Sequence, residues 1–203
     1  MDNKKLLYIK NRKVGDCSRC SLHKTRKNIV FGRGDSFADL MIVGEAPGES
    51  EDIKGIPFCG RSGDLLSKWL SFLGISEKNV YIANIVKCRP PKNRNPKQSE
   101  TLKCSPFLHL QIMAIKPKVI VSLGRVSSCF LSNNSNSSLK SLREKKLFYN
   151  CQETNMKKVP LICSYHPSYV LRVEGGFKKS RKINSMVIKD LKKALNYINK
   201  VKE

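Results

Sequence analysis

Three apolar runs of this chain are each followed or ended by a side chain that can do chemistry. Glu45 and Glu51 follow the run Leu40–Val43, Asn84 lies within a second run, and His166 follows a third. A carboxylate can stabilise a cation or orient water, an amide both donates and accepts hydrogen bonds, and an imidazole can stabilise a departing anion. Together these residue types are suited to acid–base and electrostatic catalysis in one cleft.

The segment 44–52 is acidic, although the protein carries a formal net charge of +23. An apolar, β-branched run that stops at Gly44 and is followed by Pro47 and Gly48 predicts a buried strand that ends in a tight loop. Such loops hold the ligand sites of open α/β folds. The alternative is a solvated acidic turn before a helix, where carboxylates favour the N-terminal dipole. The segment by itself leaves both interpretations open.

The polar groups are separated by alternating strand and helix patterns. Apolar runs predict core strands at 39–43, 80–86, 118–123 and 159–164 and a short edge strand at 145–149. Helical periodicity predicts helices at 64–73, 97–115, 124–131 and 178–200, with a break or kink at Pro106. This order predicts an α/β fold, a three-layer α/β/α arrangement around a central, mainly parallel four-stranded sheet. Parallel strands end at one edge, so the side chains named above should meet there.

Length and charge restrict the class of protein further. The 203 residues suit one domain, 1–203, and no apolar stretch approaches the ~20 residues of a membrane span. No signal-peptide pattern is present, so we expect a soluble, cytoplasmic protein. The basic regions, among them the segment 1–38 and the Lys-rich closing helix 178–203, favour a polyanionic partner such as nucleic acid. A lysine-biased composition that decorates every solvated face is the alternative.

The eight cysteines indicate metal ligands or core thiols rather than disulfides in an intracellular protein. Cys17 and Cys20 form a Cys-x2-Cys pair, and Cys88 and Cys104 lie among polar, basic and proline residues. Four thiolates suit either a 4Fe–4S cluster or zinc, and their spacing does not choose between the two. Core thiols are the plainer alternative.

Four segments, taken in order, resemble the family 4 uracil-DNA glycosylases, iron–sulfur members of the uracil-DNA glycosylase superfamily. They are Gly44-Glu45-Ala46-Pro47-Gly48 with Glu51-Asp52, then 57–63, then 84–91 and 166–172. The resemblance implies the uracil-DNA glycosylase version of the three-layer fold. It also implies a monofunctional enzyme that hydrolyses the N-glycosidic bond of uracil in DNA, leaves an abasic site and so initiates base excision repair.

The resemblance also implies roles for individual residues of the pocket. Phe58 would stack on a flipped uracil, the Asn84 amide would pair with its O4 and N3–H, and His166 would hydrogen-bond its O2. The loop that contains Gly44 and Ala46 would contribute backbone N–H groups and shape. Ala46 stands where the best-known branch of the superfamily has an aspartate that activates water. The carboxylate role therefore falls to Glu45 or Glu51, and the sequence does not rank them.

The implied DNA contacts surround this pocket. Leu171 is a candidate wedge for the gap that a flipped base leaves, with Arg172 beside it on phosphate, whereas a core position for Leu171 is the alternative. Basic residues around the diproline, Lys87 among them, suit phosphate contact. The cysteines would hold a structural 4Fe–4S cluster. The full implied set for DNA is Arg61, Ser62, Arg89, Leu171 and Arg172, and for the cluster Cys17, Cys20, Cys88 and Cys104.

Two other functions compete with glycosylase activity. A covalent uracil-DNA-binding relative traps its product through a histidine in an extra basic loop, but only residues 53–57 separate Asp52 from Phe58 here, without a histidine. The second is a non-catalytic iron–sulfur DNA-binding module, which the presence of Glu45, Asn84 and His166 disfavours. We therefore expect a monomer that acts on uracil-containing DNA, single- or double-stranded, with no membrane partner.

Overall fold

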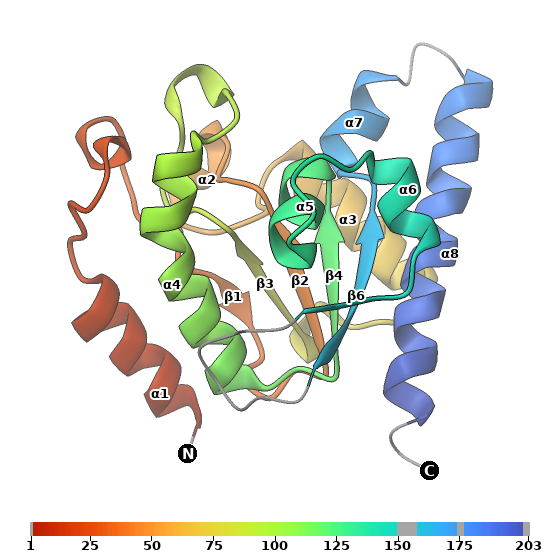
Figure 1. Ribbon diagram of the computed structural model, residues 1–203, viewed down its shortest axis with the longest axis horizontal. Coiled ribbons are helices and arrows are strands. Elements are labelled where there is room, and N and C mark those ends of the chain that lie inside the picture. Colours follow the sequence, from red (N-terminus) through yellow and green to blue (C-terminus); the bar gives the residue numbers. More distant parts are fainter. Residues whose placement is uncertain (1, 150–157, 174–176, 201–203) are drawn as a thin grey trace.

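The computed structural model describes residues 2–149, 158–173 and 177–200, and its centre is a six-stranded sheet with the order β1-β3-β2-β4-β6-β5 (Figure 1). The inner four strands are parallel, as predicted, and the two outer strands pair antiparallel with their neighbours. The predicted count of four is wrong, because a two-residue strand and the expected short edge strand extend the sheet. The strands are β1 (Arg33–Gly34), β2 (Leu40–Gly44), β3 (Val80–Asn84), β4 (Val119–Leu123), β5 (Leu147–Tyr149) and β6 (Val159–Ser164).

Helices cover both faces of the sheet, which confirms the three-layer arrangement (Figure 1). The α-helices are α1 (Asp2–Tyr8), α2 (Glu49–Lys54), α3 (Arg61–Phe72), α4 (Gln98–Ile115), α5 (Arg125–Ser132), α6 (Leu139–Glu144), α7 (Pro167–Arg172) and α8 (Phe177–Lys200). Short π or 3-10 turns are η1 (Ile9–Val14), η2 (Ser21–Lys24), η3 (Glu77–Asn79) and η4 (Pro91–Asn93). The basic N-terminal segment contains α1, η1 and η2, and residues 201–203 of the expected closing helix lie outside the described residues.

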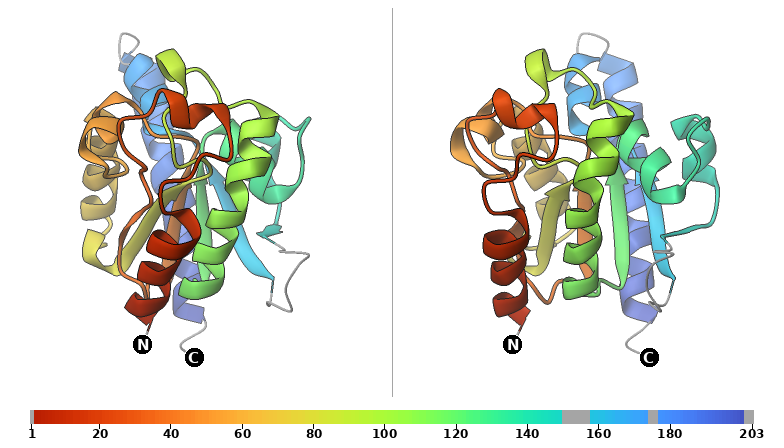
Figure 2. Two further views of the ribbon diagram at one scale, coloured as in Figure 1. Left: turned by 90° about the vertical axis from the view of Figure 1, so that its left-hand side faces the viewer. Right: turned by 60° about the vertical axis from the view of Figure 1, so that its left-hand side comes forward.

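The alternation of side chains along the central strand explains the two core layers. Met41 and Val43 of β2 pack into the cluster that α1, α4, α5 and α6 cover, whereas Leu40 and Ile42 pack into the cluster under α3, α7 and α8. Figure 2 shows α1 and α4 side by side on the first face. A strand buried on both faces needs apolar residues at every position, and β2 is buried throughout.

Of the break or kink expected at Pro106, the break is wrong, because α4 runs through this residue without interruption. A proline removes one helical N–H and leaves a carbonyl four residues earlier without its donor. Here the hydroxyl of Ser105 donates to that carbonyl, on Leu102, at 3.3 Å. The start of the helix is fixed by Glu100, whose carboxylate accepts the backbone N–H of Lys97 at 2.7 Å.

The carboxyl ends of the four parallel strands lie at one edge of the sheet, as predicted. Gly44 pairs with Asn84 across β2 and β3, and Leu123 pairs with Ser164 across β4 and β6. Helix α1 begins and α8 ends at the opposite edge (Figures 1 and 2). Among the described helices, none has the length and apolar character that crossing a membrane requires.

Candidate active site

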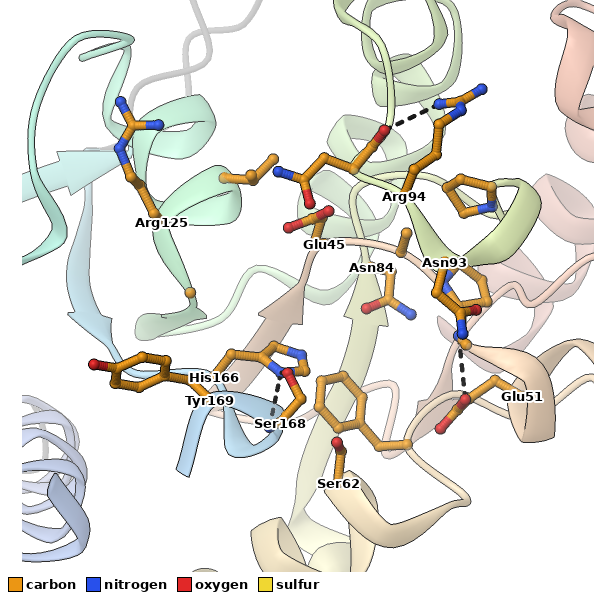
Figure 3. Close-up of a pocket in the computed structure, with 18 of the residues that line it drawn as sticks. Glu45, Glu51, Ser62, Asn84, Asn93, Arg94, Arg125, His166, Ser168 and Tyr169 are labelled. Atoms are coloured by element: carbon orange, nitrogen blue, oxygen red, sulfur yellow. Dashed lines mark hydrogen bonds between the residues drawn. The ribbon is translucent and has the colours of Figure 1, made fainter. Parts of the chain in front are cut away.

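A cleft of about 640 Å³ opens at the carboxyl edge of the sheet, between the segments that follow β2, β3, β4 and β6 (Figure 3). Most of the predicted pocket residues come together here, although they are spread over more than a hundred positions of the sequence. Those that line the cleft are Glu45, Ala46, Glu51, Phe58, Ser62, Asn84, His166 and Arg172. Sequence reasoning did not select Arg125, Tyr165 or Tyr169, which also line it.

Gly44 lets a polar group and an aromatic ring approach the end of β2. A Cβ at this position would lie 2.3 Å from Oδ1 of Asn84 and 2.8 Å from Cζ of Phe58. The Asn84 side chain is 2% exposed, and its Oδ1 has no hydrogen-bond partner among the described residues. Because buried polar atoms are almost always paired, this oxygen indicates a donor from a ligand.

Phe58 adopts a backbone conformation that bulky residues rarely adopt, with φ of 51°. Its carbonyl packs against the start of α3, where a Cβ on Gly63 would lie 1.9 Å away. Arg33 donates to the Pro57 carbonyl at 2.9 Å and to the Phe58 carbonyl at 3.4 Å. These contacts hold the ring 5.7 Å, centroid to centroid, from the imidazole of His166. Phe58 and His166 therefore form adjacent walls of the cleft.

His166 has a defined tautomer. The residue caps α7, and its Nδ1 accepts the backbone N–H of Ser168 at 3.1 Å. A backbone N–H can only donate, so in the neutral ring the proton is on Nε2. Burial, and then the charge of Arg172, lowers the pKa of His166 to about 4. At neutral pH this side chain is an uncharged hydrogen-bond donor.

The structure separates the two candidate carboxylates. Glu51 accepts the backbone N–H of Gly48 at 3.1 Å and so caps α2, at the edge of the cleft (Figure 3). Glu45 is half-buried, its carboxylate has no hydrogen-bond partner among the described residues, and burial raises its pKa. Figure 3 shows Glu45 inside the cleft beside Asn84. Both oxygens of Glu45 are thus available to a ligand in the described cleft, whereas Oε2 of Glu51 is occupied by the Gly48 N–H.

Asp52, to which the sequence pattern assigned no role, ties the N-terminal segment to this loop. Its carboxylate accepts the backbone N–H groups of Lys27 at 2.9 Å and Asn28 at 3.2 Å, and its side chain is buried. The first turn of α2 holds three acidic residues, Glu49, Glu51 and Asp52, which the sequence does not distinguish, and only the packing of the N-terminal segment against α2 gives Asp52 this role.

Some of the residues predicted to contact DNA line the cleft, and others lie outside it. Arg172 and Ser62 line the cleft, whereas Arg61 is exposed at the start of α3 and is not among the lining residues. Arg89 lies beside the cleft and pairs with Glu49 at 3.2 Å. Leu171 is half-exposed and belongs to neither described core cluster, which leaves it accessible as a wedge.

Lys87 is not a phosphate contact, and that prediction is wrong. The side chain is 1% exposed, and its Nζ donates to the carbonyl of Asn84 at 2.8 Å and to Oε1 of Gln111 at 2.6 Å. Gln111 donates in turn to the Phe31 carbonyl and to the Tyr81 hydroxyl, both at 2.9 Å. Burial lowers the pKa of Lys87 to about 8. The ammonium group supports the end of β3 from behind the cleft.

The four predicted cysteine ligands line one small cavity between the N-terminal segment, the loop after β3 and α4. All four are free thiols; Cys88 and Cys104 are buried, and Cys17 and Cys20 are half-buried. Cations face them, since Arg26 donates to Sγ of Cys88 at 3.5 Å. Within the described residues no three His, Cys, Asp or Glu side chains are placed to hold a metal ion as they stand. The thiols thus line a common cavity but do not converge on the position of a single metal ion.

Comparisons with known proteins agree with this geometry. The sequence model of the uracil DNA glycosylase superfamily matches residues 31–192, most of the chain. The chain belongs to the uracil-DNA glycosylase superfamily. It is 42% identical to a type-4 uracil-DNA glycosylase of Saccharolobus solfataricus, over 84% of this chain and 78% of the relative.

Two further relatives within the superfamily carry the same description. A type-4 uracil-DNA glycosylase of Thermotoga maritima is 40% identical over 96% of each chain. One of Archaeoglobus fulgidus is 42% identical over 83% of this chain and 88% of its own length. The similarity to the Thermotoga maritima protein therefore extends over nearly the whole chain.

Proposed function

We propose that this chain is a uracil-DNA glycosylase of the type-4 kind, which hydrolyses the N-glycosidic bond of uracil in DNA and leaves an abasic site. The observation that carries the proposal is the buried Oδ1 of Asn84, which has no partner within residues 2–149, 158–173 and 177–200 and lies in a cleft that Phe58 and His166 also line. Relatives that bear this name resemble the chain over most of its length. The base must leave the helical stack to enter such a cleft.

The cleft is suited to reading the Watson–Crick edge of uracil. Oδ1 of Asn84 would accept the N3–H of the base, and Nδ2 would donate to O4. Cytosine presents an acceptor at N3 and a donor at N4, so both contacts would oppose it. The Phe58 ring, held at a fixed angle to His166, would stack on one face of the base. Lys87 keeps the backbone of Asn84 in place from behind.

His166 would stabilise the leaving group as a hydrogen-bond donor. When the bond to the sugar breaks, negative charge develops on uracil, and Nε2–H of the neutral ring would donate to its O2. Because the imidazole pKa is near 4, the ring is not an imidazolium at neutral pH and would donate this hydrogen bond without transferring a proton to the base. The uracil would leave as an anion.

Glu45 is the carboxylate that we assign to the sugar side. Positive charge develops on the deoxyribose as the bond breaks, and a carboxylate nearby stabilises it and orients the attacking water. Glu45 lies inside the cleft without a partner among the described residues, whereas the Glu51 carboxylate already caps α2. Glu51 would hold the shape of the loop.

The four thiols would hold a 4Fe–4S cluster. Their donor set fits it, because four free cysteines line one cavity beside cations that would balance the charge of the cluster. When bound, the cluster supplies four covalent cross-links among segments far apart in the sequence. Cys17 and Cys20 would thereby fix the N-terminal segment against the loop of Cys88 and the helix of Cys104. Excision needs no redox step.

The test of the proposal uses a uracil-containing oligonucleotide, alkaline cleavage of abasic sites and a denaturing gel. We expect cleaved product from the wild type, and a steep loss from Asn84→Asp and His166→Ala while binding to undamaged DNA persists. A band that resists denaturant would indicate a covalent binder instead, and no product at all would indicate a passive binding module. Unchanged rates in both variants would refute the site assignment.

A further inference from the structure

The cleft extends past the uracil end to a second region. Its volume of about 640 Å³ is typical of sites for ligands much larger than a single pyrimidine ring. Beyond His166 it is lined by Gly124, Arg125, Val126, Leu139, Tyr165 and Tyr169. Figure 3 shows Arg125 and Tyr169 on the side of His166 that faces away from Glu51 and Ser62. Both carboxylates that line the cleft belong to the uracil end.

Two aromatic side chains form a fixed surface in this region. The rings of Tyr165 and Tyr169 stack with centroids 5.6 Å apart and planes 18° from parallel. The guanidinium of Arg143 lies 4.7 Å from the centre of the Tyr165 ring. Arg143 is itself held by two bonds to the buried carboxylate of Asp190, at 2.8 and 3.1 Å. The aromatic pair is therefore anchored to α8 through Arg143.

A cation lines the same part of the cleft as this aromatic pair. Arg125 donates from Nε to the carbonyl of Ser137 at 3.1 Å and from Nη2 to that of Ser135 at 3.4 Å. These bonds leave part of the guanidinium for a ligand, and Arg172 lines the same cleft. An aromatic surface beside arginine, without a carboxylate in this part of the described cleft, is the arrangement that single-stranded nucleic acid uses for a base and its phosphate.

We propose that Tyr165 and Tyr169 form a subsite for the base of a nucleotide next to the flipped uridine, with Arg125 on its phosphate. This inference rests on the proposed function and names the form of substrate that it favours. In a duplex the neighbouring base is paired and stacked, whereas in a single strand it is free to lie on the tyrosines. The subsite therefore favours excision from single strands.

The test measures kcat/KM for uracil release from a single strand with Tyr169→Ala, Tyr165→Ala and Tyr169→Phe. We expect a roughly 5- to 150-fold loss for each alanine variant, mainly in KM, and near wild-type rates for the phenylalanine variant, which keeps the ring. Tyr197→Ala is the matched control, because Tyr197 packs half-buried against the same core cluster outside the cleft.

A second substrate series separates loss of the subsite from damage to the fold. In it, the nucleotide on the 5′ or the 3′ side of the uridine is replaced in turn by an abasic tetrahydrofuran unit. On the side where the neighbouring base binds the tyrosines, the replacement should lower kcat/KM of the wild type. The ratio of wild-type kcat/KM to that of Tyr169→Ala should then approach one. The subsite would be refuted if this ratio of kcat/KM stayed the same on both abasic strands. It would also be refuted if the alanine variants lost as much kcat/KM on duplex DNA as on single strands. A wild type that releases no uracil would overturn the proposed function instead.

Discussion

The neutral state of His166 leads to a prediction about stability that is independent of catalysis. The unfolded ring titrates near its ordinary pKa of 6.5, whereas burial and Arg172 hold the folded pKa near 4. As pH falls below 6.5, the imidazole of His166 becomes protonated in the unfolded chain but stays neutral in the folded chain. Folding free energy is therefore lost as pH falls from about 6.5 towards 4, and this contribution is constant below that range.

The size of this contribution follows from the two pKa values. When the pH is lowered from 7.5 to 5.5, this ring should lower the free energy of unfolding of the wild type by about 1.3 kcal/mol. Its full effect, reached near pH 4, is about 3 kcal/mol. His166→Gln removes the titrating group, so the variant should lack this part of the pH dependence. Any loss of capping at Ser168 in the variant shifts its stability equally at every pH.

The assay is denaturant unfolding of wild type and His166→Gln at pH 7.5, 6.5 and 5.5, together with an NMR titration of the imidazole signals. The variant identifies the His166 signal, and His23→Gln, which removes an imidazole outside the cleft, should leave that signal's titration unchanged. A His166 signal with its midpoint near 6.5, or equal pH dependence of stability in both proteins, would refute the argument.

Three other predictions test individual contacts, two of them with a matched control variant. Glu45→Gln should lower the single-turnover excision rate roughly 100-fold or more. Glu51→Gln keeps an acceptor for the Gly48 N–H and should lower this rate far less. Gly44→Ala should abolish most excision while the protein stays folded, as circular dichroism would report, because the new methyl group displaces the Asn84 amide. Lys87→Met should lower the free energy of unfolding by roughly 1–3 kcal/mol, because it leaves two buried acceptors unpaired. Lys92→Met on the exposed loop is the control and should change the free energy of unfolding by at most ~0.5 kcal/mol. Urea titrations compare the two variants with the wild type.

Much of the fold could be predicted because its information is local. The four parallel strands are largely apolar runs, and β2 ends where Gly44 stops the pattern, whereas β3 ends at Asn84 although the apolar run predicted at 80–86 continues to Val86. Strand β1 was missed because two residues carry no periodicity, and its pairing with β3 depends on a distant partner. The break at Pro106 was wrong because the Ser105 hydroxyl replaces the missing donor.

Most of the predicted pocket residues line one cleft, and they could be named from the sequence because chemistry at strand ends needs few kinds of side chain. Tertiary structure alone decided the hydrogen-bond partners and burial on which the roles proposed for them rest. The choice of Glu45 over Glu51 depends on which carboxylate a backbone N–H already occupies, and the tautomer of His166 on the donor at Ser168. The position of Lys87 behind Asn84, and not on the surface, depends on Gln111 of a different helix. Hydrogen-bond partners and burial are properties of segments that meet only in the folded chain.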